Sequence, residues 1–215
     1  MKSLIAAVLL MLPAVVLAQP HQTYVAVQAG GTWLPTDNYT NNYPSDVKVV
    51  YKRGYAAAVR VGQRFDRNWR IELEGAYTAN KADSITDEVP SNPAYGIKFP
   101  ASGNLTAVSL MVNMLYDFSP RGRWHPYVGG GLGATQVSLN NVGQSGYPAI
   151  IDDSHKGASY QAIAGIEMDL TNTAALYASY HFIGTQLPRY RATNGNAFSA
   201  YYKANVVSIG VRWFL

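Results

Sequence analysis

Residues 107–118 read Ala-Val-Ser-Leu-Met-Val-Asn-Met-Leu-Tyr-Asp-Phe, and this stretch indicates the kind of fold more clearly than any other. Its even-numbered residues are all apolar or aromatic, whereas Ser109, Asn113 and Asp117 lie among the odd-numbered ones. A period of two is typical of a β-strand, in which successive side chains point to opposite faces. Only the even-numbered face tolerates lipid along its whole length. We therefore expect a strand with lipid on one side and a polar environment on the other.

Seven other segments alternate in the same way, two of them less regularly. They are residues 24–33, 55–65, 69–77, 127–139, 160–170, 176–182 and 207–215. Most have about ten residues, which is the length that a tilted strand needs to cross the hydrocarbon layer of a membrane. The chain is therefore predicted to contain eight membrane-spanning strands.

The connections between these segments alternate between short and long. Short, turn-rich links are expected at residues 66–68, 119–124 and 171–173, and long loops at residues 35–51, 81–102, 140–156 and 187–201. A membrane barrel places its short turns at the periplasmic end and its long loops outside. Backbone N–H and C=O groups in lipid must be paired within the protein, which only helices and closed barrels achieve. The predicted fold is therefore an all-β, eight-stranded antiparallel up-and-down transmembrane β-barrel.

The first residues are typical of a secretory signal peptide. Lys2 gives a positive start, residues 4–17 form an apolar run, and a small residue follows at the expected cleavage site. The run is shorter than the roughly 20 residues of a membrane-spanning helix, and Pro13 would break its middle. We expect residues 1–18 to be a signal peptide and residues 19–215 to form the outer-membrane β-barrel domain.

The composition excludes several classes of function. Only 14% of the 215 residues are charged, 12% are aromatic, and cysteine is absent. The lack of cysteine excludes disulfide scaffolds and zinc sites built from thiolates. The formal net charge of +4 is modest and accompanies no nucleic-acid-binding motif, so no nucleic-acid partner is expected.

The inward face of the barrel is predicted to carry a polar network. The interior of an eight-stranded barrel is just wide enough for side chains to fill. The inward residues of this network are expected to be Arg60, Arg64, Arg70, Glu72, Glu74, Asn113, Asp117, Glu167, Asp169, His181 and Arg212. Positive and negative charges nearly balance, and buried charges must be paired. We interpret them as ion pairs that fill the lumen, and a narrow selective pore is the alternative interpretation.

The sequence predicts no catalytic residue, cofactor or metal site. His181 is the one histidine expected to point inward, and Ser179 shares its face about 7 Å away at the backbone. That spacing is long for a hydrogen bond between serine and histidine, so a structural histidine is expected. Asp152, Asp153 and His155 in a loop are interpreted as solvated side chains and not as ligands of a cation.

Two motifs carry a resemblance to a known family. Residues 115–118 (Leu-Tyr-Asp-Phe), a short turn, and residues 124–133 (Trp-His-Pro-Tyr-Val-Gly-Gly-Gly-Leu-Gly) resemble a central hairpin of the small porin-like outer-membrane barrels. That family includes OmpA-type and opacity-type surface proteins. The C-terminal residues 208–215 resemble the signal read by the barrel-assembly machinery, with Gly210, Trp213 and Leu215 at its key positions, although the signal usually ends on an aromatic residue. The resemblance implies an integral protein of the Gram-negative outer membrane and no single activity.

The predicted function is that of a structural and surface-interaction protein with four extracellular loops. Loops on a rigid scaffold often carry binding sites, and these loops are rich in tyrosine, which suits recognition of a host or matrix ligand. Cations at the loop ends of the strands are expected to hold phosphates of lipopolysaccharide. They are Lys52, Arg53, Arg189, Arg191 and Lys203. The alternatives are a small diffusion pore and, less expected, an enzyme that modifies lipids.

Overall fold

The computed structural model describes residues 23–35, 38–39, 47–87, 93, 96–119, 122–147, 151–191 and 197–215. The expected signal peptide at residues 1–18 lies outside these ranges. Among the described residues, no helix is long and apolar enough to cross a membrane.

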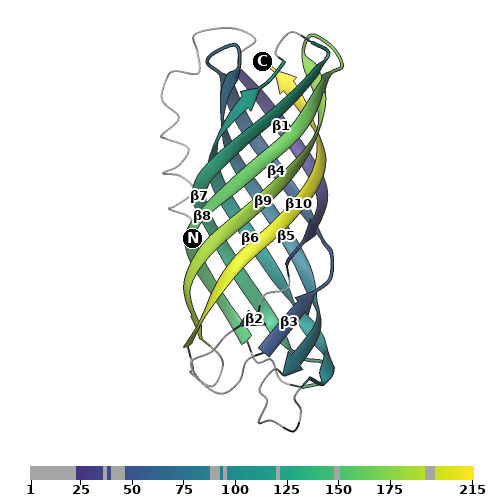
Figure 1. The fold of residues 1–215 in the computed structure, drawn as a ribbon, viewed down its shortest axis with the longest axis vertical. Coiled ribbons are helices and arrows are strands. Elements are labelled where there is room, and N and C mark those ends of the chain that lie inside the picture. Colours follow the sequence, from purple (N-terminus) through teal and green to yellow (C-terminus); the bar gives the residue numbers. More distant parts are fainter. Residues whose placement is uncertain are drawn as a thin grey trace.

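Eight long strands form a closed ring, which confirms the predicted fold (Figure 1). They are β1 (Thr23–Trp33), β4 (Gly54–Arg64), β5 (Trp69–Asp87), β6 (Lys98–Asp117), β7 (Trp124–Gln144), β8 (Ile151–Asp169), β9 (Ala174–Arg191) and β10 (Ala197–Phe214). Each pairs antiparallel with the next along the chain, and β10 pairs with β1 to close the ring. Closure leaves no free sheet edge within the paired part of the wall.

Side chains alternate between the two faces of the wall as the sequence predicts. On β6, Val108, Leu110, Val112 and Met114 are exposed on the outside, whereas Met111, Asn113 and Leu115 are buried inside. Aromatic residues gather on the outer face near the two ends of the strands. Trp69, Phe118 and Trp213 lie at the end with the short turns, and Trp33, Tyr55 and Tyr77 lie towards the other end. We call these the turn end, at the top of Figure 1, and the loop end, at the bottom.

The extent of the long loops is where the sequence-based prediction is wrong. Six of the strands, β5 to β10, continue well into the segments expected to be loops, and each has 18 to 21 residues. The first expected loop contains two short strands, β2 (Asn38–Tyr39) and β3 (Val47–Tyr51), and β3 pairs with the loop end of β5. Beyond the lipid, outward side chains meet water and need not be apolar. The alternation in the sequence therefore ends although the backbone pairing of the strands continues.

Candidate functional site: the barrel lumen

Three buried arginines and three buried glutamates form an ionic layer across the lumen. Arg60, Arg70 and Arg212 come from β4, β5 and β10, and Glu72, Glu74 and Glu167 come from β5 and β8. We define the ionic layer as these six residues. Their charged groups are almost completely shielded, since no side chain in the layer is more than 2% exposed.

The ion pairs of this layer join adjacent strands, as Arg60 of β4 and Glu74 of β5 do, and strands across the lumen, as Arg70 of β5 and Glu167 of β8 do. Arg60 Nε lies 2.5 Å from Glu74 Oε2, and Arg70 Nη1 lies 3.3 Å from Glu167 Oε2. Arg212 contacts both Glu167 and Glu72, the second with an N–O distance of 3.4 Å. Each cation therefore meets an opposite charge, as burial of charge requires. Because the pairs of Arg70 with Glu167 and of Arg212 with Glu72 cross the interior, the layer fills its cross-section.

Three tyrosines pack the ionic layer against the wall, and each lies over a glycine of the next strand. Tyr24, Tyr127 and Tyr177 pair with Gly62, Gly165 and Gly210 respectively. A Cβ atom on any of these glycines would lie within 2.5 Å of the tyrosine ring, so only glycine leaves room for it. The arginines stack on the same rings, with the Arg212 guanidinium 4.3 Å from the Tyr24 centroid and that of Arg70 4.5 Å from Tyr127.

The turn end of the lumen is more open. Arg64 pairs with Asp117 at 3.1 Å, and His125 Nε2 lies 2.8 Å from Asp169 Oδ2. A cavity of about 460 Å³ borders Arg64, His125 and Asp169. Among the histidines, only His181 was expected to point inward, so a buried His125 was not expected. It is nevertheless a buried residue at the start of β7, because its ring bonds both Asp169 and the carbonyl of Ser119.

Ser179 and His181 are closer than the sequence-based prediction allowed. His181 Nε2 lies 3.1 Å from Ser179 Oγ, because the two side chains lean towards each other from the same face of β9. The remaining contacts of His181 differ from those of a catalytic dyad. Arg60 lies 2.9 Å from the same nitrogen, where it donates a hydrogen bond, and Nδ1 faces the amide of Gln161 in place of a carboxylate. A nitrogen that accepts from a guanidinium is a poor general base.

Hydroxyl groups form a belt next to this histidine on the loop side of the ionic layer. Ser109 and Thr135 are 2.9 Å apart, Ser159 donates to Thr135 at 2.7 Å, and Ser159 lies 2.9 Å from Thr185. We call these four residues the hydroxyl belt. It runs across β6, β7, β8 and β9 and satisfies its polar groups internally.

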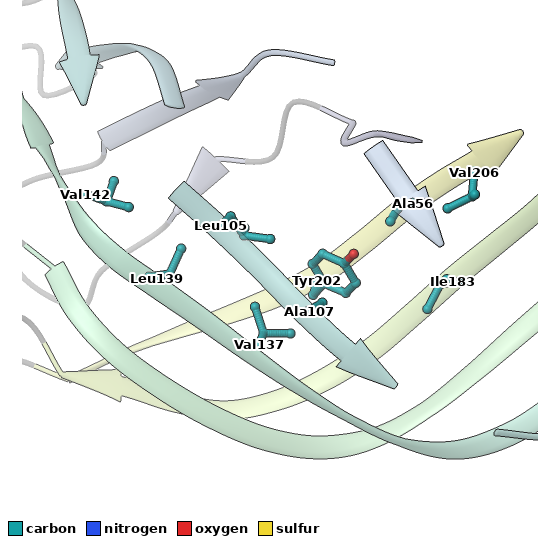
Figure 2. Packing of buried hydrophobic residues seen from close by; sticks show 10 residues of the cluster. Ala56, Leu105, Ala107, Val137, Leu139, Val142, Ile183, Tyr202 and Val206 are labelled. Atoms are coloured by element: carbon teal, nitrogen blue, oxygen red, sulfur yellow. The ribbon is translucent and has the colours of Figure 1, made fainter. Parts of the chain in front are cut away.

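The loop half of the lumen is apolar, which the sequence did not reveal. Figure 2 shows side chains from β4, β6, β7, β9 and β10 that point towards a common interior space. We call this set the apolar compartment: Ala56, Leu105, Ala107, Val137, Leu139, Val142, Ile183, Tyr202, Ala204 and Val206. The Tyr202 hydroxyl lies 2.8 Å from Thr78 Oγ1, so its one polar group is paired.

The cations predicted at the rim are only partly described. Lys52 lies 3.6 Å from Asp83, and both side chains are exposed. Arg53 is exposed and directly precedes Gly54, the first residue of β4, which pairs with Thr32 of β1. The next residue of β1, Trp33, pairs with Asn205 of β10. Lys203 lies two residues further towards the loop end of β10. The side chains of Arg189 and Arg191 lie outside the described residues.

The structure thus brings together most of the predicted lumen residues. Asn113 accepts a hydrogen bond from Gln161 at 2.6 Å, and Asp117 is shared by Arg64 and Arg70. Asp169 lies apart from the ionic layer at the half-exposed turn end. Over the described ranges, no three histidine or carboxylate side chains gather in a way that would hold a metal ion.

The residues of the predicted assembly signal lie at the closing seam of the barrel. Trp213 faces outwards, and the N–H of Leu215 donates to the Thr23 carbonyl at 2.9 Å. Gly210 faces the lumen beneath the Tyr177 ring, so it also has a packing role. Recognition by an assembly machinery stays a prediction.

Known proteins agree with this geometry. A model of the outer membrane protein β-barrel domain matches residues 3–213. No curated protein matches the sequence.

Several solved structures share the fold. Neisserial surface protein A is 18% identical with a TM-score of 0.56, over 90% of this chain and 97% of that one. The outer membrane protein OprG from Pseudomonas aeruginosa is 12% identical with a TM-score of 0.55, over 91% and 99%. The outer membrane protease OmpT from Escherichia coli is 9% identical with a TM-score of 0.57, over 92% and 98%. Identities this low show a common fold and nothing of a common activity.

Proposed function

The chain belongs to the outer membrane protein β-barrel family, and we propose that it is a non-conducting, non-enzymatic anchor that presents a surface for interactions outside the Gram-negative cell. It is an integral protein of the outer membrane, in contact with membrane lipids and lipopolysaccharide. By the orientation common to such barrels, the turn end faces the periplasm and the loop end faces outwards. We also propose that residues 1–18 are removed on export and that the barrel-assembly machinery reads the C-terminal strand.

The ionic layer is the observation that carries the proposal against a diffusion pore. Arg70 and Arg212 are completely buried, and both contact Glu167 from across the lumen. Ions in transit would have to break contacts between buried charges, and removal of one partner of such a pair costs about 3–5 kcal/mol. A barrel closed in this way holds its wall rigidly, which suits a scaffold for the segments at its loop end.

The contacts of His181 support the absence of enzymatic activity. Its Nε2 atom is shared between Arg60 and Ser179, at 2.9 and 3.1 Å, and both neighbours are buried inside the lumen. A serine nucleophile needs an unoccupied base and access to its substrate. Neither condition is met here, because the His181 base is occupied and Ser179 is shielded from a lipid or peptide outside the barrel.

Single-channel recording tests the non-conducting role. The purified barrel in a planar bilayer is expected to give no steady unit conductance, under conditions in which a general diffusion porin conducts. A reproducible ion-selective conductance would support the small pore instead.

Binding of lipopolysaccharide tests the role of the rim. Arg53 and Lys203 lie on the same side of the barrel, through the pairing of β4 with β1 and of β1 with β10. Guanidinium and ammonium groups bind phosphate, so replacing both residues with Gln is expected to weaken binding of purified lipopolysaccharide several-fold. The matched control replaces two exposed lysines on other strands, Lys81 and Lys98. Equal loss in both variants would show that only net charge matters, and no loss in either would remove the rim from the proposal.

A further inference from the structure

The barrel wall is split at its loop end between β8 and β9. In the described part of the chain, the pairing of these strands ends at Ser159 and Thr185, although β8 begins at Ile151 and β9 continues to Arg191. Over the same stretch β8 still pairs with β7, as far as Ile151, and β9 still pairs with β10, as far as Arg191. The two strands therefore diverge while each keeps its other neighbour.

A cavity of about 400 Å³ lies at the point where the seam opens. From the outer face it is bordered by Leu132, Ala158, Tyr160, Gly184 and Lys203, and from the lumen face by Ser159, Thr185 and Tyr202. Successive residues of a strand point to opposite faces, so an intact sheet separates these two groups. Ser159 and Thr185 form the last pair of β8 with β9, and Ala158 lies just beyond it, so the cavity lies where this pairing ends.

Two tyrosines shape this cavity. Tyr160 pairs with Gly184, and a Cβ atom on Gly184 would lie 2.4 Å from its ring, so the glycine allows the ring to lie across the seam on the outer face. Tyr202 is buried on the lumen side and belongs to the apolar compartment. Figure 2 shows its ring at the centre of that compartment, between Ala107 and Ala56. The cavity therefore borders the apolar compartment through Tyr202, and none of its described lining residues belongs to the ionic layer.

The charge of the lining indicates one kind of occupant. Among the described residues that border the cavity, Lys203 is the one charged side chain, and the remainder are apolar or carry a neutral hydroxyl group. Lys203 also lies near the membrane surface, because it is two residues from Asn205, which pairs with Trp33 of the outer aromatic girdle. The volume falls at the lower end of the range for small-molecule sites, which suits one chain and not a lipid with several.

We propose that this seam cavity binds a single-chain anionic amphiphile, such as a fatty acid, with its tail between Tyr160 and Tyr202 and its head group at Lys203. The ligand enters sideways through the split wall. The ionic layer closes the lumen below it, so the cavity is a binding site and not part of a channel. This inference goes beyond the surface-anchor role and stands whether or not the rim binds lipopolysaccharide.

Native mass spectrometry of the full barrel in a neutral detergent tests the proposal with laurate as the probe. We expect one bound laurate per protein, and much weaker binding of dodecyl maltoside and dodecyltrimethylammonium, which carry the same chain on neutral and cationic heads. Ala158→Phe fills the mouth of the cavity and is expected to abolish the laurate adduct. Ala162→Phe, on the same outer face of β8 where the seam is paired, is expected to retain it. Lys203→Gln is expected to weaken binding about fivefold, the size of a partly exposed charge contact.

Several outcomes would overturn the proposal. They are the absence of a laurate adduct, equal binding by the two phenylalanine variants, and equal binding of the three head groups. Binding of lipopolysaccharide that displaces laurate from the unaltered protein, and that is itself lost in Ala158→Phe, would assign the cavity to lipopolysaccharide and contradict a single-chain ligand.

A photoreactive laurate gives a second readout on the unaltered protein in case Ala158→Phe fails to fold. Crosslinks are expected at residues 158–160 and 202–203. Crosslinks spread evenly along the lipid-facing wall, for example over residues 108–114, would contradict the site.

Discussion

The two halves of the lumen are both filled with side chains, but one half is filled by ion pairs and the other by apolar residues. Towards the turn end, Arg60, Arg70 and Arg212 meet carboxylates and are fully buried. Towards the loop end, Leu105, Leu139 and their neighbours pack like the core of a soluble protein. The first arrangement depends on every charge keeping its partner, and the second depends on filled volume. The halves should therefore respond to different kinds of substitution.

Glu72→Gln should give the largest loss of stability, because Glu72 contacts Arg60, Arg70 and Arg212 and accepts a hydrogen bond from the Tyr24 hydroxyl at 2.7 Å. The change keeps the shape of the side chain but leaves three buried cations short of a negative charge. We expect a loss of about 3–5 kcal/mol in the free energy of unfolding. Urea unfolding of the refolded barrel in lipid measures it. A loss below that of an ordinary surface substitution would mean that water already screens the ionic layer.

Leu139→Ala should give the next largest loss, by a different cause. Leu139 is 2% exposed in the apolar compartment, and its truncation leaves a cavity that costs about 2–4 kcal/mol. Leu110→Ala on the lipid-facing side is the control, because lipid chains fill the space that the side chain leaves. The same urea titration compares the two. If both variants lose the same stability, the loop half of the lumen is not packed as a core.

Gly165→Ala should cost less, about 1–3 kcal/mol, because it forces the Tyr127 ring away from its place against Arg70. Gly75→Ala is the matched control on an outward-facing position, where the new Cβ would make an ordinary contact of 3.8 Å with Val59. Thermal unfolding followed by gel mobility separates the two variants. Equal stability would show that the tyrosine rings are free to move.

Asp83→Asn should have the smallest effect. Asp83 lies 3.6 Å from Lys52 and 4.0 Å from Lys98, but all three side chains are exposed at the rim. Exposed pairs contribute about 0–1 kcal/mol, so unfolding in urea should change little, and less still in high salt. A loss as large as that of Glu72→Gln would remove the distinction between rim and lumen.

The sequence predicted the strands of the barrel wall correctly where lipid requires every second side chain to be apolar. Residues 108–118 face hydrocarbon on alternate positions, and no other pattern would keep that surface apolar. Beyond the lipid, the outward residues of β8 include Asp152 and Lys156, which read as a loop although the backbone pairing continues. The alternation of apolar and polar residues is absent there because outward side chains in water need not be apolar.

The lumen was predictable in its charges but not in its contacts. Charged inward residues such as Glu72 and Arg212 stand out against the apolar residues on either side of them. The apolar compartment was missed because the alternation is reversed there: Leu105 lies between Asn104 and Thr106, whereas the polar positions were expected to face the lumen. Backbone spacing also misled the prediction for Ser179 and His181, because side chains on one face of a strand can lean together by several ångströms.

Accessibility of an engineered thiol tests the closed lumen most directly, since the chain has no native cysteine. Ser109→Cys places a thiol in the hydroxyl belt, between the ionic layer and the apolar compartment, where the residue is buried. Ser145→Cys places one on the exposed loop end as a reference. A membrane-impermeant maleimide is predicted to label Cys at the reference position when it is applied from the loop side of a reconstituted membrane, and to leave the lumen thiol unmodified from either side. Labelling of both thiols at similar rates would mean that water passes through the barrel, and the account of a closed lumen would be wrong.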